Sequence, residues 1–354
     1  MSVDSLRNLA RNVIRKPYVD TCVEVLWHSG EPLVLPIAFY ARAFDILESE
    51  KYAPVRLDHG IQTNGTLLNE KWCAFIKERG VSVSVSIDGP SVFHDVNRRD
   101  RVGNGTHDRA MRGVRLLREH GLDFNVICVL TANNLRHPKE LFDFFEDIGA
   151  RRIGFNCEEI VGSKVTSSLN SNAAVERFAI FLGTYADLCI QRRSRQEVRE
   201  IASMTQFIFG TTGCVVSGTA TPYHYISVDY AGNISTFSPE LITSSHARFQ
   251  EFSFGNVSDP GCMQFEGNRR FDRIRSEIEA GVKLCQQNCG YFQVCGGGDP
   301  AKKLFERNSF ATAETFACKL GVKSVFEVVM RRFASQLADG DQGLPRANHV
   351  PRAN

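Results

Sequence analysis

Apolar segments of strand length alternate with amphipathic segments of helix length over roughly the first 160 residues, and this alternation restricts the possible folds most. Helices that regularly separate strands at this spacing are typical of βα units and of a parallel sheet. We therefore expect an α/β fold, in which periodicity alone does not distinguish an open sheet from a partial barrel. The expected strands lie near residues 22–28, 55–61, 81–87, 123–130 and 152–157, and the helices between them near 37–49, 69–79, 108–120 and 138–148.

The alternation stops after about residue 160, which predicts a second unit of different construction. Tyr230-Ala-Gly-Asn233 is a hairpin signal between two short strands. The tail that follows the last expected helix lacks core-forming residues, so we expect it to be disordered. We divide the chain into residues 1–210, 211–337 and 338–354. Further helices are expected from Ser2, its capping residue, to Ile14, and at 172–193, 197–208, 268–280 and 323–337.

Charge and hydropathy exclude some classes of protein. A formal net charge of +2 over 354 residues argues against a nucleic-acid-binding protein, because such proteins carry a marked basic excess. No apolar run approaches the length of a membrane span, and no signal peptide is visible. We therefore expect a cytoplasmic protein with neither a nucleic-acid nor a membrane partner.

Polar turns follow the first two predicted strands at their carboxyl ends, where α/β proteins place ligand-binding groups. The first turn contains Gly30, Glu31 and Pro32. Glycine lets the backbone approach a ligand closely, and the carboxylate can receive an amino group. Asn64 follows the second strand, although Asn-Gly is a turn signal in its own right.

The third strand alternates β-branched residues with serines and leads to Asp88-Gly-Pro90. Small residues that face a barrel interior leave room for a ligand, whereas an ordinary half-exposed strand is the alternative interpretation. The fifth strand has a similar polar face. The polar faces consist of Ser82, Ser84 and Ser86 in the third strand and of Gly154, Asn156 and Glu158 in the fifth.

Four of the eleven cysteines form a separate group. The other seven are scattered, and buried packing explains most of them, because free cysteine behaves as a small apolar residue. Four thiolates suit zinc or an iron–sulfur cluster, and the ligands alone do not decide which. The long gap before the last cysteine favours a cluster, and a reducing compartment disfavours disulfides. The group consists of Cys285, Cys289, Cys295 and Cys318, with three glycines directly after Cys295.

Together these motifs resemble the radical SAM enzymes that carry a carboxyl-terminal SPASM-type domain. The resemblance extends from Met1 to about residue 330. Within this family, Thr236-Phe-Ser-Pro-Glu240 and the run from Cys295 to Lys303 are most similar to cyclophane-forming peptide maturases that act on glycine-rich-repeat precursors. The motifs that carry the family resemblance are His28-Ser-Gly-Glu-Pro32, Gln62-Thr-Asn-Gly-Thr66, Val85-Ser-Ile-Asp-Gly-Pro90, His94-Asp95 with Arg98, Gly103-Asn-Gly-Thr-His-Asp108 and the run 289–298.

The resemblance implies a partial (β/α)6 radical SAM barrel and following helices over residues 1–210, and a small Cys-rich SPASM-like domain over residues 211–337. It implies that S-adenosylmethionine binds at the barrel opening and that the four grouped cysteines, Cys285, Cys289, Cys295 and Cys318, hold an auxiliary 4Fe-4S cluster. Gly30, Glu31 and Pro32 would lie at the amino end of S-adenosylmethionine, Ser86 and Arg98 near its carboxylate, and Asn64 and Asp88 along the same opening.

The implied activity is that of an oxidoreductase that modifies peptides. Enzymes of this family cleave S-adenosylmethionine reductively to a deoxyadenosyl radical, which abstracts a hydrogen atom from a peptide side chain. In the cyclophane subgroup, a carbon–carbon bond then joins an aromatic ring to a nearby β-carbon of a ribosomally made precursor peptide. The implied partners are that peptide and an electron donor such as flavodoxin or ferredoxin.

One departure from the family pattern matters for activity. Family members carry a C-x3-C-x2-C motif upstream of the Ser-Gly-Glu-Pro turn, and this sequence has none. Those cysteines hold the cluster that cleaves S-adenosylmethionine, so we expect that the first barrel strand and its cluster loop are absent and that the chain as given is inactive. We favour truncation of a longer protein, which mapping of the translation start would test. A catalytically dead peptide-binding protein with structural zinc in the cysteine group is the alternative.

Two further points stay open in the sequence. Many SPASM domains have a cluster cysteine where this chain reads Ser235-Thr-Phe-Ser238, so the number of auxiliary clusters is not fixed. We expect Cys262 to pack rather than to bind a cluster. Glu158 and Asp299 are the candidate catalytic bases, but a salt bridge or a turn is the expected role of each.

Overall fold

A six-stranded parallel sheet forms the centre of the first unit. We describe residues 1–15, 18–19, 21–160, 166–210 and 217–338 of a computed structural model. The strands pair in chain order, so each crossover moves the chain one strand further in the same direction. The predicted parallel α/β fold is therefore confirmed. The strands are β1 (Cys22–Trp27), β2 (Arg56–Thr63), β3 (Ser82–Ser86), β4 (Asn125–Leu130), β5 (Arg152–Cys157) and β6 (Glu197–Val198).

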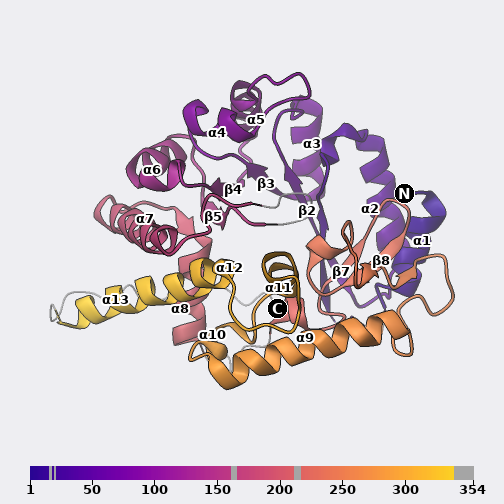
Figure 1. Ribbon diagram of the computed structural model, residues 1–354. Helices are drawn as coiled ribbons and strands as arrows, with labels where there is room; N and C mark the ends of the chain where they lie inside the picture. Colours follow the sequence, from indigo (N-terminus) through magenta and orange to yellow (C-terminus); the bar gives the residue numbers. More distant parts are fainter. Residues whose placement is uncertain (16–17, 20, 161–165, 211–216, 339–354) are drawn as a thin grey trace.

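Helices α2 to α7 form an arc around the sheet, and the later elements lie on its open side (Figure 1). The predicted helices of this unit are all present within a few residues of their expected bounds. Two elements were not predicted, the short helix α4 and the two-residue strand β6. The helices are α1 (Val3–Asn12), α2 (Ile37–Glu50), α3 (Glu70–Arg79), α4 (Ser91–Asn97), α5 (His107–Glu119), α6 (Pro138–Asp147), α7 (Asn172–Gln191) and α8 (Arg199–Phe209).

The second unit combines small antiparallel sheets with one long helix, α9 (Arg269–Asn288). The predicted hairpin is confirmed as β7 (Ile226–Val228) and β8 (Asn233–Thr236), to which β11 (Gly255–Asn256) adds a third strand. A separate pair is formed by β9 (Ser245–His246) and β10 (Gln250–Glu251). The remaining helices are α10 (Phe292–Cys295), α11 (Pro300–Arg307), α12 (Phe316–Cys318), a π-helical turn (Lys319–Ser324) and α13 (Val325–Ala338), and 3-10 turns span Pro32–Val34, Asn134–Arg136, Gly218–Ala220 and Pro239–Leu241.

The two larger hydrophobic cores correspond to the two units, and segments near the chain ends connect them, while a small third cluster joins α1 to α2 through Ala10, Ile14, Leu47 and Val55. The core of the second unit is rich in phenylalanine, and Val13 of the amino-terminal segment is part of it. Conversely, Val325, Val328 and Val329 of α13 belong to the core of the first unit. The division at residues 210 and 211 stays a prediction, and α13 packs on the first unit. Residues 339–354 of the expected disordered tail lie outside the described residues, and no helix within the described ranges is long and apolar enough to cross a membrane.

The local signals that were read from the sequence are present. Ser2 accepts a hydrogen bond from the backbone N–H of Ser5 and caps α1. In β3, Val83 and Val85 are buried, whereas the serines on the other face are partly or fully exposed. The strand thus packs its β-branched face on the helices and leaves its polar face toward the open side.

Gly113 of α5 sets the position of the turn that carries Asn64. A β-carbon on Gly113 would lie 2.2 Å from the carbonyl oxygen of Gly65 and 3.1 Å from the Leu68 side chain. We expect Gly113→Ala to lower the free energy of unfolding by about 1–3 kcal/mol, because the backbone must move to relieve this overlap. Gly321→Ala is the matched control, since a β-carbon there meets no atom within 4 Å. Urea denaturation followed by circular dichroism measures both, and an equal effect of the two substitutions would contradict the expectation.

Candidate active site

Glu31 accepts three hydrogen bonds at the carboxyl ends of β1 to β3, a region that we call the barrel mouth. The chain leaves β1 through left-handed turns at Ser29 (φ 68°) and Gly30 (φ 61°). One carboxylate oxygen of Glu31 accepts hydrogen bonds from the Thr63 hydroxyl (2.6 Å) and from the backbone N–H of Leu33 (3.1 Å). The other oxygen accepts one from the backbone N–H of Asn64 (2.8 Å). Glu31 therefore joins the turns that follow β1 and β2.

Pro32 is buried behind this carboxylate and is fixed by Tyr40 of α2. The Tyr40 hydroxyl donates a hydrogen bond of 2.8 Å to the carbonyl oxygen of Pro32. Burial raises the pKa of Tyr40 to about 12, and the nearby Glu31 carboxylate adds to the shift. Tyr40 is thus a neutral hydrogen-bond donor at neutral pH and holds the Glu-Pro turn in place.

Asn64 and Ser86 lie on adjacent strands of the same mouth. The Asn64 side-chain oxygen accepts hydrogen bonds from the backbone and hydroxyl of Thr66, at 2.9 and 2.7 Å. The Ser86 hydroxyl accepts a hydrogen bond of 2.8 Å from the Gln62 side-chain amide. The structure therefore brings Glu31, Asn64 and Ser86 together at the carboxyl ends of β1, β2 and β3.

Asp88 and Arg98 form a bidentate ion pair at the end of β3. The guanidinium donates hydrogen bonds of 2.6 and 2.9 Å to the two carboxylate oxygens, and the backbone N–H of Val129 donates a third of 2.8 Å. Asp88 is only 4% exposed. Because Arg98 is bound by Asp88, a ligand carboxylate would have to share its guanidinium. Contact between Arg98 and such a ligand stays a prediction.

His94 contacts the backbone of this ion pair. Its Nδ1 accepts a hydrogen bond of 3.3 Å from the backbone N–H of Asp88, so the ring proton lies on Nε2, which is 3.0 Å from the Thr106 hydroxyl. Thr106 in turn donates to the carbonyl oxygen of Arg98. Thr106 precedes α5 but makes no side-chain capping bond, and Asp95 accepts a hydrogen bond from the backbone N–H of His107 at the start of that helix.

Arg199 was missed by the sequence reasoning. It follows β6 directly, and a β-carbon on Gly154 would lie 2.6 Å from its guanidinium carbon. Its Nη2 donates a hydrogen bond of 2.7 Å to the Asn156 side chain, and Glu200 accepts one from the backbone N–H of Phe155. The signal for Arg199 was Gly154 itself, a residue small enough to admit a large side chain on the polar face of β5.

Glu158 and Asp299, the candidate bases, are both hydrogen bonded within the protein. Glu158 accepts a hydrogen bond from the backbone N–H of Ser168. Asp299 caps α11 by accepting from the backbone N–H of Lys302 (3.1 Å) and also accepts from the Ser238 hydroxyl (3.0 Å). Both contacts fit the structural roles that we expected.

The four grouped cysteines lie around the carboxyl end of α9. This helix was expected to end near residue 280, but it continues to Asn288 and so contains Cys285. It continues because Ile274, Ile278, Gly281 and Cys285 extend one buried face at helical spacing. Cys289 follows the helix directly, and Cys295 and Cys318 end α10 and α12.

Backbone N–H groups and a lysine partly offset the burial of these thiols. Burial raises the pKa of the Cys295 thiol, and hydrogen bonds from the backbone N–H groups of Gly297 and Gly298 oppose this effect. Glycines 296 to 298 all have positive φ, which turns these amides toward the sulfur. Lys323 interacts electrostatically with both Cys289 and Cys318.

The four cysteines fit the donor set of an iron–sulfur cluster. Within the described parts of the chain, no three His, Cys, Asp or Glu side chains are placed so that they could hold a single metal ion. In the glycine-rich turn after Cys295, the backbone N–H groups of Gly297 and Gly298 donate to the Cys295 sulfur, and hydrogen bonds to sulfur are among the features that tune iron–sulfur clusters. Cys262, by contrast, is 5% exposed within the phenylalanine-rich core. The ligand assignment to Cys285, Cys289, Cys295 and Cys318 stays a prediction.

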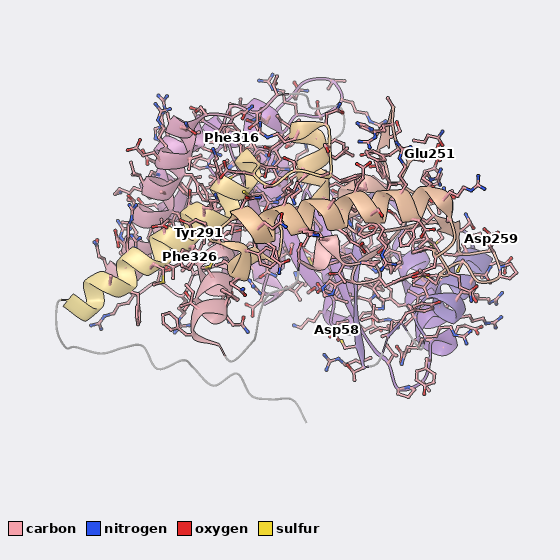
Figure 2. All side chains as sticks on the ribbon, turned by 60° about the horizontal axis from the view of Figure 1, so that its bottom comes forward. Asp58, Glu251, Asp259, Tyr291, Phe316 and Phe326 are labelled. Carbon is pink, nitrogen blue, oxygen red and sulfur yellow. The ribbon has the colours of Figure 1, made fainter. Side chains whose placement is uncertain are left out.

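Side-chain contacts connect the cysteine site to the barrel. Lys302 of α11 forms an ion pair of 2.7 Å with Glu159, which follows β5. On the other side, Tyr291 packs edge-on against Phe326 of α13, with ring centroids 5.5 Å apart, and donates a hydrogen bond to Glu327. Figure 2 shows Tyr291 and Phe326 next to each other at α13. The cysteine site is therefore fixed on the open side of the sheet.

Comparison with known proteins agrees with this fold. Residues 1–145 match the family model described as the radical SAM superfamily. An uncharacterized protein of Synechocystis is 35% identical over 93% of this chain and 84% of its own length. A serine-type anaerobic sulfatase-maturating enzyme of Bacteroides thetaiotaomicron is 27% identical over 83% of this chain and 72% of its own length.

Two solved structures share the fold. The structure titled native anSMEcpe with bound AdoMet has a TM-score of 0.75 at 20% identity and covers 96% of this chain and 91% of its own. Streptococcus suis SuiB bound to the precursor peptide SuiA has a TM-score of 0.58 at 15% identity and covers 90% of this chain and 69% of its own. A parallel α/β sheet whose strands pair in chain order, followed by a unit that contains the four grouped cysteines, defines the class. The chain belongs to the radical SAM superfamily, and it is an enzyme of the radical SAM type related to peptide and protein maturases.

Proposed function

We propose that this protein is a radical SAM peptide maturase that installs a carbon–carbon cyclophane crosslink in a ribosomally made precursor peptide. The observation that carries the proposal is the ion pair between Lys302 and Glu159, because it ties α11, next to the cysteine group, to the segment after β5, at the same carboxyl edge of the sheet as the barrel mouth. A peptide held on the open side of the sheet would lie between the cysteine group and the barrel mouth. The similarity to sulfatase-maturating enzymes and to the SuiB fold supports a peptide substrate, and the similarity of 236–240 and 295–303 to cyclophane maturases supports the bond type.

The residues of the chain have distinct parts in this proposal. When bound, S-adenosylmethionine supplies a deoxyadenosyl radical after one-electron reduction. Glu31 orients the ammonium group of that ligand, and its three internal hydrogen bonds keep the carboxylate in place. Ser86 and Arg98 bind the ligand carboxylate, Asn64 and Asp88 line the mouth, and Gly30 leaves open space for the ligand backbone.

The auxiliary cluster is proposed to sit on Cys285, Cys289, Cys295 and Cys318, and flavodoxin or ferredoxin is the proposed class of electron donor. A carbon–carbon bond between two C–H carbons removes a pair of hydrogen atoms. One hydrogen atom would be transferred to the deoxyadenosyl radical, which gives deoxyadenosine, and the other would leave as a proton and an electron. A cluster held by the four cysteines would supply a one-electron acceptor for that electron. We propose a cytoplasmic location, where such donors and reduced thiols are found.

Anaerobic reconstitution tests the cluster in the chain as it stands. With iron and sulfide, we expect a brown protein with broad visible absorption, and Cys295→Ser is expected to remove most of that absorption. Cys73→Ser is the matched control, because Cys73 is buried in the barrel core and should leave the spectrum unchanged. A colourless protein with stoichiometric zinc would instead support the catalytically dead, peptide-binding alternative.

Activity is tested in a chain extended by a C-x3-C-x2-C segment, since the sequence has none. The extended protein is incubated with S-adenosylmethionine, a reductant and a glycine-rich-repeat peptide. We expect deoxyadenosine, and a peptide that has lost a pair of hydrogen atoms, with the crosslink located by tandem mass spectrometry. Deoxyadenosine with an unmodified peptide would leave the radical chemistry in place but contradict the proposed substrate.

A further inference from the structure

Lys303 is a buried cation without a carboxylate partner in the described parts of the chain. It is 4% exposed, although lysine is almost never buried unless it is paired. Its ammonium donates hydrogen bonds to the carbonyl oxygen of Gly281 at 3.0 Å and to the sulfur of Cys285 at 3.3 Å. Burial of an uncompensated ammonium is costly, so the site calls for an anion close to Cys285.

The protein is shaped to admit this side chain. A β-carbon on Gly281 would lie 3.2 Å from the Lys303 ammonium nitrogen and 2.1 Å from the carbonyl oxygen of Phe310. Gly298, in the turn after Cys295, would place a β-carbon 3.7 Å from the Lys303 side chain. Gly281 therefore leaves the space that the Lys303 ammonium occupies beside the sulfur, and Gly298 lies within contact distance of the same side chain.

The preceding residue, Lys302, points elsewhere. Its ammonium pairs with Glu159 at 2.7 Å, and its side chain is 32% exposed. Two consecutive lysines in the first turn of α11 thus contact different parts of the protein. Lys302 pairs with the segment after β5, and Lys303 contacts Cys285. Only the second of them lacks a carboxylate partner in the described structure.

We propose that Lys303 is the counter-cation of an iron–sulfur cluster bound to Cys285 and that it raises the reduction potential of that cluster. A cluster held by thiolates is anionic and gains one further negative charge on reduction. A fixed positive charge at a ligand sulfur therefore stabilises the reduced form more than the oxidised form. The inference rests on the auxiliary cluster of the proposed function, and it assigns Lys303 a positioning and electrostatic role rather than a catalytic one.

The test is a redox titration, followed by electron paramagnetic resonance, of the reconstituted chain and its variants. Lys303→Met and Lys303→Gln remove the charge, Lys303→Arg keeps it, and Lys302→Met is the neighbouring control. We expect both neutral variants to be reduced at least tenfold less at a fixed potential, a shift of about 59 mV for one electron. Lys303→Arg and Lys302→Met should titrate close to the unmodified protein.

The outcomes separate this inference from the function on which it rests. If the unmodified chain takes up no cluster, the proposed cluster itself is wrong, and so is the inference. If the cluster forms and Lys303→Gln has the same reduction potential as the unmodified protein, the proposed cluster is supported and the role of Lys303 is overturned. If the neutral variants keep their thermal unfolding midpoint but bind no iron, while Lys303→Arg does, the cation is needed for assembly and the inference is supported.

Discussion

Asp88→Ala is expected to lower the free energy of unfolding by about 3–5 kcal/mol, the range for removing one partner of a buried ion pair. Asp88 is 4% exposed and accepts two hydrogen bonds from the Arg98 guanidinium. It also accepts the backbone N–H of Val129 at the end of β4. Alanine would therefore leave a guanidinium that is 24% exposed and a backbone donor without their acceptor. Urea denaturation at neutral pH measures the loss.

Asp58→Ala is the control for this prediction. Asp58 also pairs with an arginine, Arg56, at 2.9 Å, but the two side chains are 52% and 66% exposed. Figure 2 shows Asp58 at the periphery of the molecule. An exposed pair of this kind contributes within about 1 kcal/mol. Equal losses for Asp58→Ala and Asp88→Ala would show that burial does not set the cost, and a double variant, Asp88→Ala with Arg98→Met, should recover part of the loss.

The sequence predicted the fold well where one residue pattern determines local structure. The Val and Ser alternation of β3 predicted both its strand and its two faces, and the buried valines confirm them. The end of α9 was predicted too early. The helix continues past Gly281 because no strong helix breaker follows in the sequence and because Cys285 is buried on the same helix face. Strand β6 has only two residues, too few to show a period.

The sequence predicted which residues form the candidate site, but it did not predict which of them contact one another. Glu31, Asn64 and Ser86 were identified because they follow strands whose carboxyl ends meet in a parallel sheet. That Arg98 binds Asp88, or that Arg199 lies over Gly154, depends on contacts between residues distant in the chain. Neighbouring residues in the sequence carry no signal for such contacts, and the same holds for the opposite directions of Lys302 and Lys303.

The stability of the barrel mouth is expected to fall in acid because of His94. The pKa of His94 is lowered to about 4, mainly by burial and also by the Arg98 guanidinium and His107, while Asp88 and Asp95 oppose the shift. An unfolded chain binds the proton near its ordinary pKa of about 6.5. Between these values the unfolded state holds more protons, so the free energy of unfolding rises with pH. The contribution is complete above about pH 6.5 and is lost as the pH falls toward 4.

A shift of this size corresponds to roughly 3 kcal/mol, and His94→Gln isolates it. Glutamine is polar but does not titrate, so the difference in unfolding free energy between the two proteins should narrow by about that amount between pH 7 and pH 4. His59, whose pKa burial also lowers to about 4, remains in both proteins and cancels in the difference. The carboxylates with lowered pKa values cancel in the same way. A difference that stays constant over this pH range would show that His94 is protonated in the folded state as readily as in the unfolded one, and the hydrogen bond from Asp88 to its Nδ1 would then be misassigned.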